Sequence, residues 1–327
     1  MTSTTPEEQT GPPDQVTLPR GRTVELAGRG SLFVRQGFSS SSGDQNPPLV
    51  LLHGWGATAD LNWFSSYEAL EGEFDFLAPD LRGHGRGIHD GRRFRLADVA
   101  DDVAALITAE IGRPATIVGY SMGGTVAQLL WRRHPELVAG LVLCSTAANF
   151  RSSRREHLFF SAVSLTAALA RLTPGTVRSD VAWWVMSNRG GRELRQWAIA
   201  ELEGHDWLRI VEAGHEIGRF DSRRWLGGLD VPAAQILTLD DEIIPARRQE
   251  ELALTIGQDP PTRIRGGHSV CIENPAVFAP TLTAAAHAVA AHAVAARISP
   301  PRGSSEAARS ARPPGPRRGR GGFRDHR

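Results

Sequence analysis

Ser121 lies at the centre of a Gly-x-Ser-x-Gly motif, residues 119–123, which directly follows the short apolar run 115–118. The apolar run predicts a buried strand, and the periodic apolar residues after the motif predict a helix. A serine on a sharp turn from strand to helix has a strained backbone that pushes its hydroxyl outward. The helix that follows directs its N-terminus, with its partial positive charge, at any oxyanion formed there. The pattern therefore indicates nucleophilic catalysis by Ser121.

A serine hydroxyl is a weak nucleophile at neutral pH, so it needs a base, and the base needs an acid to orient it. Three adjacent acids at residues 240–242 follow one predicted strand, and His268 follows another after two glycines. Ligands bind at the carboxyl ends of the strands in open α/β sheets, so we expect these groups to meet Ser121 at one edge. The order serine, acid, histidine is that of the hydrolase triad. The residues alone leave the choice among the three acids open.

A turn rich in glycine, residues 53–56, follows the apolar run 49–52. Such a turn can direct a backbone N–H at the space above Ser121. Together, the backbone N–H groups of Trp55 and Met122 would form an oxyanion hole with two donors. The alternative is a simple turn between a strand and a helix.

Apolar runs alternate with segments of helical periodicity, which predicts an α/β fold with a mostly parallel sheet flanked by helices. The predicted strands are residues 23–27, 31–38, 49–52, 74–78, 115–118, 141–144, 231–239 and 262–265. The predicted helices are residues 96–111, 122–134, 244–256 and 275–298. Between residues 151 and 225 the pattern contains no convincing strand, which indicates a helical insertion between two strands of the sheet.

We therefore expect a disordered leader (1–21), a first part of the core (22–149), a helical cap (150–226), a second part of the core (227–298) and a disordered tail (299–327). Five of the eight tryptophans lie in the cap. They either line an apolar pocket or bury the cap against the core, and we expect a mixture of the two. The pocket candidates are Trp55, Tyr120, Trp183 and Trp184.

The composition is that of a soluble globular protein, with 327 residues of which 41% are hydrophobic and 22% are charged. The N-terminus has no basic-then-apolar pattern, and no apolar run approaches the length of a membrane span. Two cysteines, Cys144 and Cys271, lie in apolar segments and do not form a disulfide framework. We expect a cytoplasmic protein with no membrane span.

The tail carries eight arginines against Glu306 and Asp325, a balance of +6, while the whole chain has a net charge of +1. The rest of the chain is therefore mildly acidic, at −5. The Arg/Gly stretch 317–322 is similar to segments that touch RNA or anionic surfaces. We favour a solvated extension over a nucleic-acid partner, because runs of like charge are usually solvated.

The chain resembles the α/β-hydrolase superfamily, in its branch of small esterases, lactonases and perhydrolase-like enzymes, over roughly residues 22–298. The motifs above carry the resemblance, together with Asp-Leu-Arg-Gly-His-Gly at residues 80–85. In that family the acid lies four residues before a proline, which selects Asp241 over Asp240. The resemblance implies a triad of Ser121, Asp241 and His268 beneath a helical cap. Arg82 and His84 are interpreted as residues that fix their loop.

The implied activity is hydrolysis of a carboxylic ester, lactone or thioester of a small to medium apolar substrate through an acyl-serine intermediate. The same triad serves acyl transfer, C–C bond hydrolysis and perhydrolysis, which pocket shape and not sequence separates. A non-catalytic binding scaffold is the alternative from another class, and the complete triad disfavours it. The mechanism needs no metal or organic cofactor, and His287 and His292 are spaced wrongly for a metal site. The sequence carries no signal for an oligomeric state.

Overall fold

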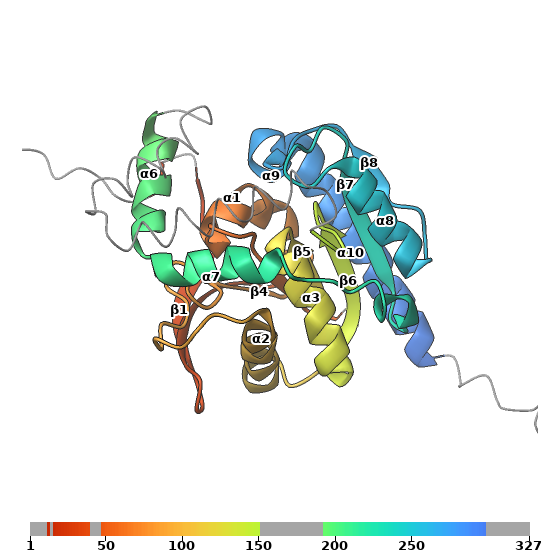
Figure 1. Ribbon diagram of the computed structural model, residues 1–327, viewed down its shortest axis with the longest axis horizontal. Helices are drawn as coiled ribbons and strands as arrows, with labels where there is room; N and C mark the ends of the chain where they lie inside the picture. Colours follow the sequence, from red (N-terminus) through yellow and green to blue (C-terminus); the bar gives the residue numbers. More distant parts are fainter. Residues whose placement is uncertain (1–11, 14–15, 40–46, 151–191, 299–327) are drawn as a thin grey trace, which may run out of the picture.

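An eight-stranded sheet, in the order β1-β2-β4-β3-β5-β6-β7-β8, crosses the part of the chain that the computed structural model describes, residues 12–13, 16–39, 47–150 and 192–298 (Figure 1). The strands are β1 (Arg20–Leu26), β2 (Gly30–Gly37), β3 (Leu49–Leu52), β4 (Phe76–Pro79), β5 (Ala115–Tyr120), β6 (Val138–Cys144), β7 (Ala233–Thr238) and β8 (Thr262–Ile264). The pairs β1–β2 and β2–β4 are antiparallel, and the other pairs are parallel. The predicted α/β fold with a mostly parallel sheet is confirmed.

Helices cover both faces of this sheet (Figure 1). They are α1 (Ala59–Leu70), α2 (Leu96–Glu110), α3 (Met122–Arg133), α6 (Arg192–Glu203), α7 (Trp207–Ile217), α8 (Ala246–Ile256), α9 (Val270–Glu273) and α10 (Pro275–Ile298), with 3₁₀ turns η1 (Pro135–Leu137) and η2 (Leu226–Gly228). In β3, Val50 and Leu52 pack with α2 and α3, whereas Leu49 and Leu51 pack with α1 and α10. The strand is buried on both faces, which is why its sequence is an unbroken apolar run.

The observed elements follow the predicted ones closely, except that α1 and the short α9 were not predicted. Its N-cap is Thr58, whose side chain accepts the Leu61 N–H. The buried residues of α1 include Asp60, Asn62 and Ser66. These polar residues interrupt the apolar periodicity from which a helix is predicted. Asp60 forms an ion pair with Arg35 of β2 at 2.8 Å. This is a tertiary contact, which the local sequence pattern does not predict.

The N-terminal boundary differs from the expected one. Strand β1 begins at Arg20, which places the start of the core two residues before the expected 22. Val16 and Leu18, expected within the disordered leader, pack against the small cluster that contains Trp197 of α6. The apolar side chains at these two positions therefore attach the segment that precedes the first strand to the core.

Helix α10 contains one stretch, Pro275–Ala295, that is long and apolar enough to cross a membrane by length and composition. A helix that covers the core of a globular protein meets the same criteria, so the stretch does not by itself indicate a membrane span. Phe278, Leu282, Ala286 and Val289 of this helix are buried against the sheet. An Ala-rich helix that covers a sheet needs few polar residues, and this explains its composition.

Candidate active site

Ser121 occupies the turn between β5 and α3, with a φ of 53° that non-glycine residues rarely adopt. Its N–H donates to the carbonyl of Cys144 at 3.0 Å, and its carbonyl accepts from Thr146 Oγ1 at 2.7 Å. A Cβ at Gly123 would lie 2.1 Å from the carbonyl oxygen of Leu52 in β3. The glycine of the motif is thus required by a backbone contact, and the neighbouring strands hold the serine in its strained conformation.

His268 lies in the loop between β8 and α9 and contacts both partners expected of it. Its Nε2 is 2.9 Å from Ser121 Oγ, and its Nδ1 is 2.8 Å from Asp241 Oδ2. The hydroxyl of Tyr120 donates to the His268 carbonyl at 2.7 Å. The imidazole is therefore oriented by Asp241 on one side and directed at the serine hydroxyl on the other.

Asp241, in the loop after β7, is the acid that reaches the histidine. Its Oδ1 accepts the N–H groups of Ile243 at 2.9 Å and Ile244 at 2.8 Å. Asp240 is exposed instead and accepts the Gly266 N–H at 3.1 Å. The alternation of side chains along the turn gives the two neighbouring acids different environments. Glu242 is exposed as well, so the geometry separates Asp241 from both neighbouring acids, a choice that the residues alone left open.

The loop at residues 53–57 lies against the serine. A Cβ at Gly54 would be 3.5 Å from Ser121 Cβ, and the Gly54 N–H donates to Asn62 Oδ1 of α1 at 2.9 Å. The indole N–H of Trp55 donates to the carbonyl of Ile210 in α7 at 2.6 Å. Met122 is the first residue of α3, so its N–H has no acceptor within the helix. Both N–H groups expected to form the oxyanion hole thus belong to elements beside Ser121.

Tyr120 does not have the surroundings expected of a pocket residue. Its side chain is only 3% exposed and packs with its ring edge-on to Trp63 and Phe278. Tyr120 is therefore a core residue that supports the His268 backbone. The other aromatic candidates, Trp183 and Trp184, lie outside the described residues. Trp55 is half-buried, and its indole contacts Ile210 and Gly214 of α7, so its place in a pocket stays a prediction.

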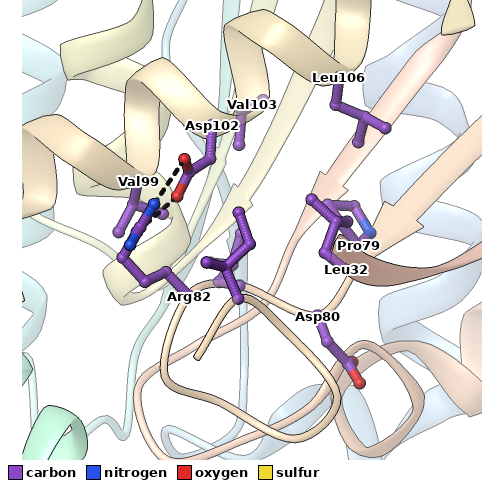
Figure 2. Close-up of a pocket in the computed structure, with 10 residues that line it drawn as sticks. Leu32, Pro79, Asp80, Arg82, Val99, Asp102, Val103 and Leu106 are labelled. Atoms are coloured by element: carbon purple, nitrogen blue, oxygen red, sulfur yellow. Dashed lines mark hydrogen bonds and ion pairs between the residues drawn. The ribbon is translucent and has the colours of Figure 1, made fainter. Parts of the chain in front are cut away.

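Arg82 fixes the loop that follows β4, as expected. Its guanidinium donates twice to the carboxylate of Asp102 in α2, at 2.7 and 2.9 Å (Figure 2). It also donates once to Asp90. Arg82 and Asp102 border a small cavity whose lining contains none of the three side chains brought together at Ser121. We assign the cavity a packing role only. Bidentate pairing of this kind favours a single loop geometry.

Three buried histidines connect the loops of the core to the turn between α6 and α7. Their rings contact one another in a row at tilted to edge-on angles, with centroids 5.2 Å apart for His53 and His84 and 5.5 Å apart for His84 and His205. His53 Nδ1 faces the Gly54 carbonyl at 2.8 Å, and its Nε2 accepts the Leu81 N–H at 2.9 Å, which fixes a neutral tautomer. Burial lowers the pKa of both His53 and His205 to about 4, and it lowers that of His84 well below its usual value.

We expect the free energy of unfolding to fall as the pH is lowered from 6.5 toward 4. The unfolded chain binds protons near pH 6.5, whereas the folded chain does not accept them at His53 and His205 until about pH 4. Each histidine contributes at most roughly 3 kcal/mol to this loss. Urea unfolding at several pH values measures it, and His205→Gln should lose less stability than the wild type over the same range.

Exposed His292 provides the matched control, and His292→Gln should keep the decline of the wild type. Burial raises the pKa values of Asp80 and Glu201, which makes these two acids act in the opposite direction. They are present in every variant, so the difference between His205→Gln and the wild type isolates the histidine. Equal declines in all three proteins would contradict the assignment of this effect to the buried histidines.

No group of three or more His, Cys, Asp or Glu side chains able to hold a metal ion occurs among the residues that the structure describes. His287 and His292, which the sequence placed on the last helix, both lie on α10. His287 contacts Glu73 at 3.3 Å, and His292 is exposed.

The fold, together with the turn from strand to helix that carries Ser121, defines the class of α/β hydrolases. The chain belongs to this family, whose alpha/beta hydrolase fold model matches residues 47–183. It is 30% identical over 266 residues to the pimeloyl-[acyl-carrier protein] methyl ester esterase of Neisseria meningitidis, covering 77% of this chain and 93% of that relative.

Two further proteins are similar over most of the chain. The pyrrolizixenacetamide deacetylase of Xenorhabdus hominickii is 26% identical over 238 residues, which are 72% of this chain and 88% of the relative. The structure of a thermophilic esterase from Thermogutta terrifontis superposes with a TM-score of 0.67 at 23% identity, covering 83% of this chain and 99% of that one. This last likeness concerns the fold.

Sequence reasoning missed the polar side chains that support the site from beneath. Asn62 holds the loop at residue 54, while Thr238 and Gln249 surround Asp241. A threonine at the end of a predicted strand, three residues before an acid, is a weak signal that could have been noticed. Gln249 lies within a helix and offers no local signal, because only the packing of α8 brings it to the carboxylate.

Proposed function

We propose that this protein is a serine hydrolase that cleaves a carboxylic ester of a small to medium apolar substrate, with Ser121, His268 and Asp241 as its catalytic triad. The observation that carries the proposal is the position of the His268 ring, 2.9 Å from Ser121 Oγ and 2.8 Å from Asp241 Oδ2. A pure binding scaffold would have no use for a base held between a serine and a buried acid.

In the proposed reaction, Ser121 Oγ attacks the substrate carbonyl while His268 Nε2 takes the hydroxyl proton. Asp241 keeps the imidazole oriented and stabilises its protonated form. The backbone N–H groups of Trp55 and Met122 hold the oxyanion, and the N-terminus of α3 adds its partial positive charge. His268 then gives the proton to the leaving alcohol. Water activated by His268 attacks the acyl-serine and releases the acid.

The substrate class rests on two supports. The similar proteins named above include a methyl ester esterase and a deacetylase, whose reactions both release an acyl group from an oxygen or a nitrogen. Trp55, half-buried and next to Gly54 in the loop that lies against Ser121, packs its indole on α7, and we propose that its exposed part borders an apolar pocket. Acyl transfer, lactone or thioester opening, C–C bond hydrolysis and perhydrolysis use the same residues, but no described contact favours any of them over ester hydrolysis.

We also propose that residues 150–226 form a cap over the site of a cytoplasmic enzyme. The described part of this segment is attached to the core next to the serine loop. The Thr58 hydroxyl donates to Glu201 of α6 at 2.9 Å, and Trp55 donates to the Ile210 carbonyl of α7. These contacts support a role for α6 and α7 as a fixed wall beside the substrate.

Hydrolysis of p-nitrophenyl esters with acyl chains of increasing length tests the proposed function. We expect measurable turnover, with kcat/KM passing through a maximum at a short to medium chain because the cap limits the pocket. Adding an alcohol as a competing acceptor separates hydrolysis from acyl transfer through the products formed. A folded protein with no turnover on any ester and no covalent reaction with a fluorophosphonate would contradict the proposal.

A further inference from the structure

Hydrogen bonds around Asp241 continue beyond the loop to two buried side chains, one on β7 and one on α8. Thr238, the last residue of β7, donates from Oγ1 to Asp241 Oδ2 at 2.9 Å. Gln249 of α8 donates from Nε2 to Thr238 Oγ1 at 2.8 Å and lies 3.3 Å from Asp241 Oδ2. Both side chains are fully buried. Polar groups at such depth are expensive unless they are paired, so their arrangement is well defined.

The amide of Gln249 is held at both ends. Its Oε1 accepts the Thr238 N–H at 3.1 Å, and its Nε2 donates to the carbonyl of Ile244 at 2.8 Å. One of the two amide hydrogens is thus used by Ile244, and the other faces the Thr238 hydroxyl. Since the hydroxyl must accept from this hydrogen, its own single hydrogen is left to donate elsewhere.

The Asp241 carboxylate is the best acceptor for the hydrogen of the Thr238 hydroxyl. The Ser145 hydroxyl lies 3.4 Å from Thr238 Oγ1, whereas Asp241 Oδ2 is at 2.9 Å and carries charge when ionised. The direction of hydrogen bonding then runs from Gln249 to Thr238 and from Thr238 to Asp241. The same carboxylate oxygen, Oδ2, is the one that faces His268 Nδ1.

We propose that Thr238 and Gln249 are positioning residues for the reaction, which fix the rotation of the Asp241 carboxylate so that Oδ2 stays on His268 Nδ1. Terminal carboxylate torsions are broad, so a carboxylate without such support samples many orientations. Two backbone N–H groups already hold Oδ1, and the Thr238 hydroxyl completes the restraint at Oδ2. This inference rests on the proposed function, because it assumes that the orientation of His268 limits turnover.

The test compares Thr238→Val, Thr238→Ser and Gln249→Met by steady-state kinetics on the best p-nitrophenyl ester. We expect Thr238→Val to lower kcat by about 10- to 100-fold, because an error of about 1 Å in a catalytic group costs on the order of 10²-fold. KM should stay within about twofold, since neither residue touches the substrate. Thr238→Ser should recover most of the lost kcat because it keeps the hydroxyl.

The double variant tests whether the two residues act in series. Gln249→Met should lower kcat by about tenfold, and adding it to Thr238→Val should lower kcat by less than the product of the single effects, because the shorter contact of Gln249 is with the Thr238 hydroxyl, at 2.8 Å against 3.3 Å to the carboxylate. Gln235→Met is the matched control. Gln235 is a buried glutamine on β7 whose amide donates to the backbone carbonyl of Gln249 at 2.7 Å, away from the carboxylate. It should lose stability while kcat is kept.

Three results would overturn the proposed positioning role of Thr238 and Gln249. They are a kcat of Thr238→Val within twofold of the wild type, equal losses of kcat in Thr238→Ser and Thr238→Val, or a loss of kcat in Gln235→Met as large as that in Gln249→Met. If Thr238→Val does not fold, Gln249→Met against Gln235→Met decides the same question. Failure of the proposed function looks different, because turnover would then be absent or would survive in Ser121→Ala. Turnover that depends on Ser121 but does not change on substitution of Thr238 or Gln249 would overturn the positioning role and leave the proposed function intact.

Discussion

Replacing Ser121 by alanine is expected to lower kcat for p-nitrophenyl ester hydrolysis by about 10⁶-fold, while the protein stays folded. The reason is that Oγ is the atom that would form the covalent intermediate, and it lies 2.9 Å from His268 Nε2, the base that would take its proton. The same variant should lose the mass increase that a fluorophosphonate produces on the intact wild-type protein. Both readouts depend on one oxygen atom.

Ser66→Ala is the matched control for this experiment. Ser66 is a fully buried serine on α1 whose hydroxyl has no hydrogen-bond partner among the described residues, so its loss should leave kcat unchanged. Thermal unfolding should give similar midpoints for Ser121→Ala and the wild type, because alanine meets the same strained φ as serine. Turnover by Ser121→Ala at the wild-type rate would contradict the proposed role of Ser121 as the nucleophile.

Asp241→Asn is expected to lower kcat by about 10⁴-fold, whereas Asp240→Asn should change it by less than about twofold. The N–H groups of Ile243 and Ile244 require an acceptor at Oδ1, so the asparagine must place its NH₂ group on the His268 side. That group donates to Nδ1 and shifts the remaining proton to Nε2. An Nε2 that carries a proton cannot take one from Ser121.

The neighbouring acid gives this experiment its control. Asp240 is exposed, and its carboxylate accepts the Gly266 N–H at 3.1 Å, a bond that an asparagine oxygen can accept equally well. Steady-state kinetics of the two variants, with far-ultraviolet circular dichroism to verify folding, separate the candidates directly. A large loss in Asp240→Asn together with a mild one in Asp241→Asn would reverse the assignment of the acid.

Much of the fold follows from local patterns. The run at residues 49–52 predicted β3 to the residue, and the periodic segment at 275–298 predicted α10 in the same way. Strands buried on both faces and helices with one apolar face have simple signatures. Helix α1 lacks such a signature because buried Asp60 and Ser66 interrupt its apolar face, and Asp60 is satisfied by Arg35 from a distant strand.

The sequence by itself determined the class of the fold, the strand-to-helix turn at Ser121 and the edge of the sheet where its partners gather, because these depend on local periodicity and on chain direction. The residues by themselves left the acid open; the family resemblance selected Asp241, and the tertiary structure shows this carboxylate 2.8 Å from His268. The tertiary structure also shows that the Tyr120 hydroxyl donates to the His268 carbonyl and that the Gln249 amide lies next to the Asp241 carboxylate. Side-chain direction at a turn and contacts between distant elements are set by packing, which no local pattern encodes.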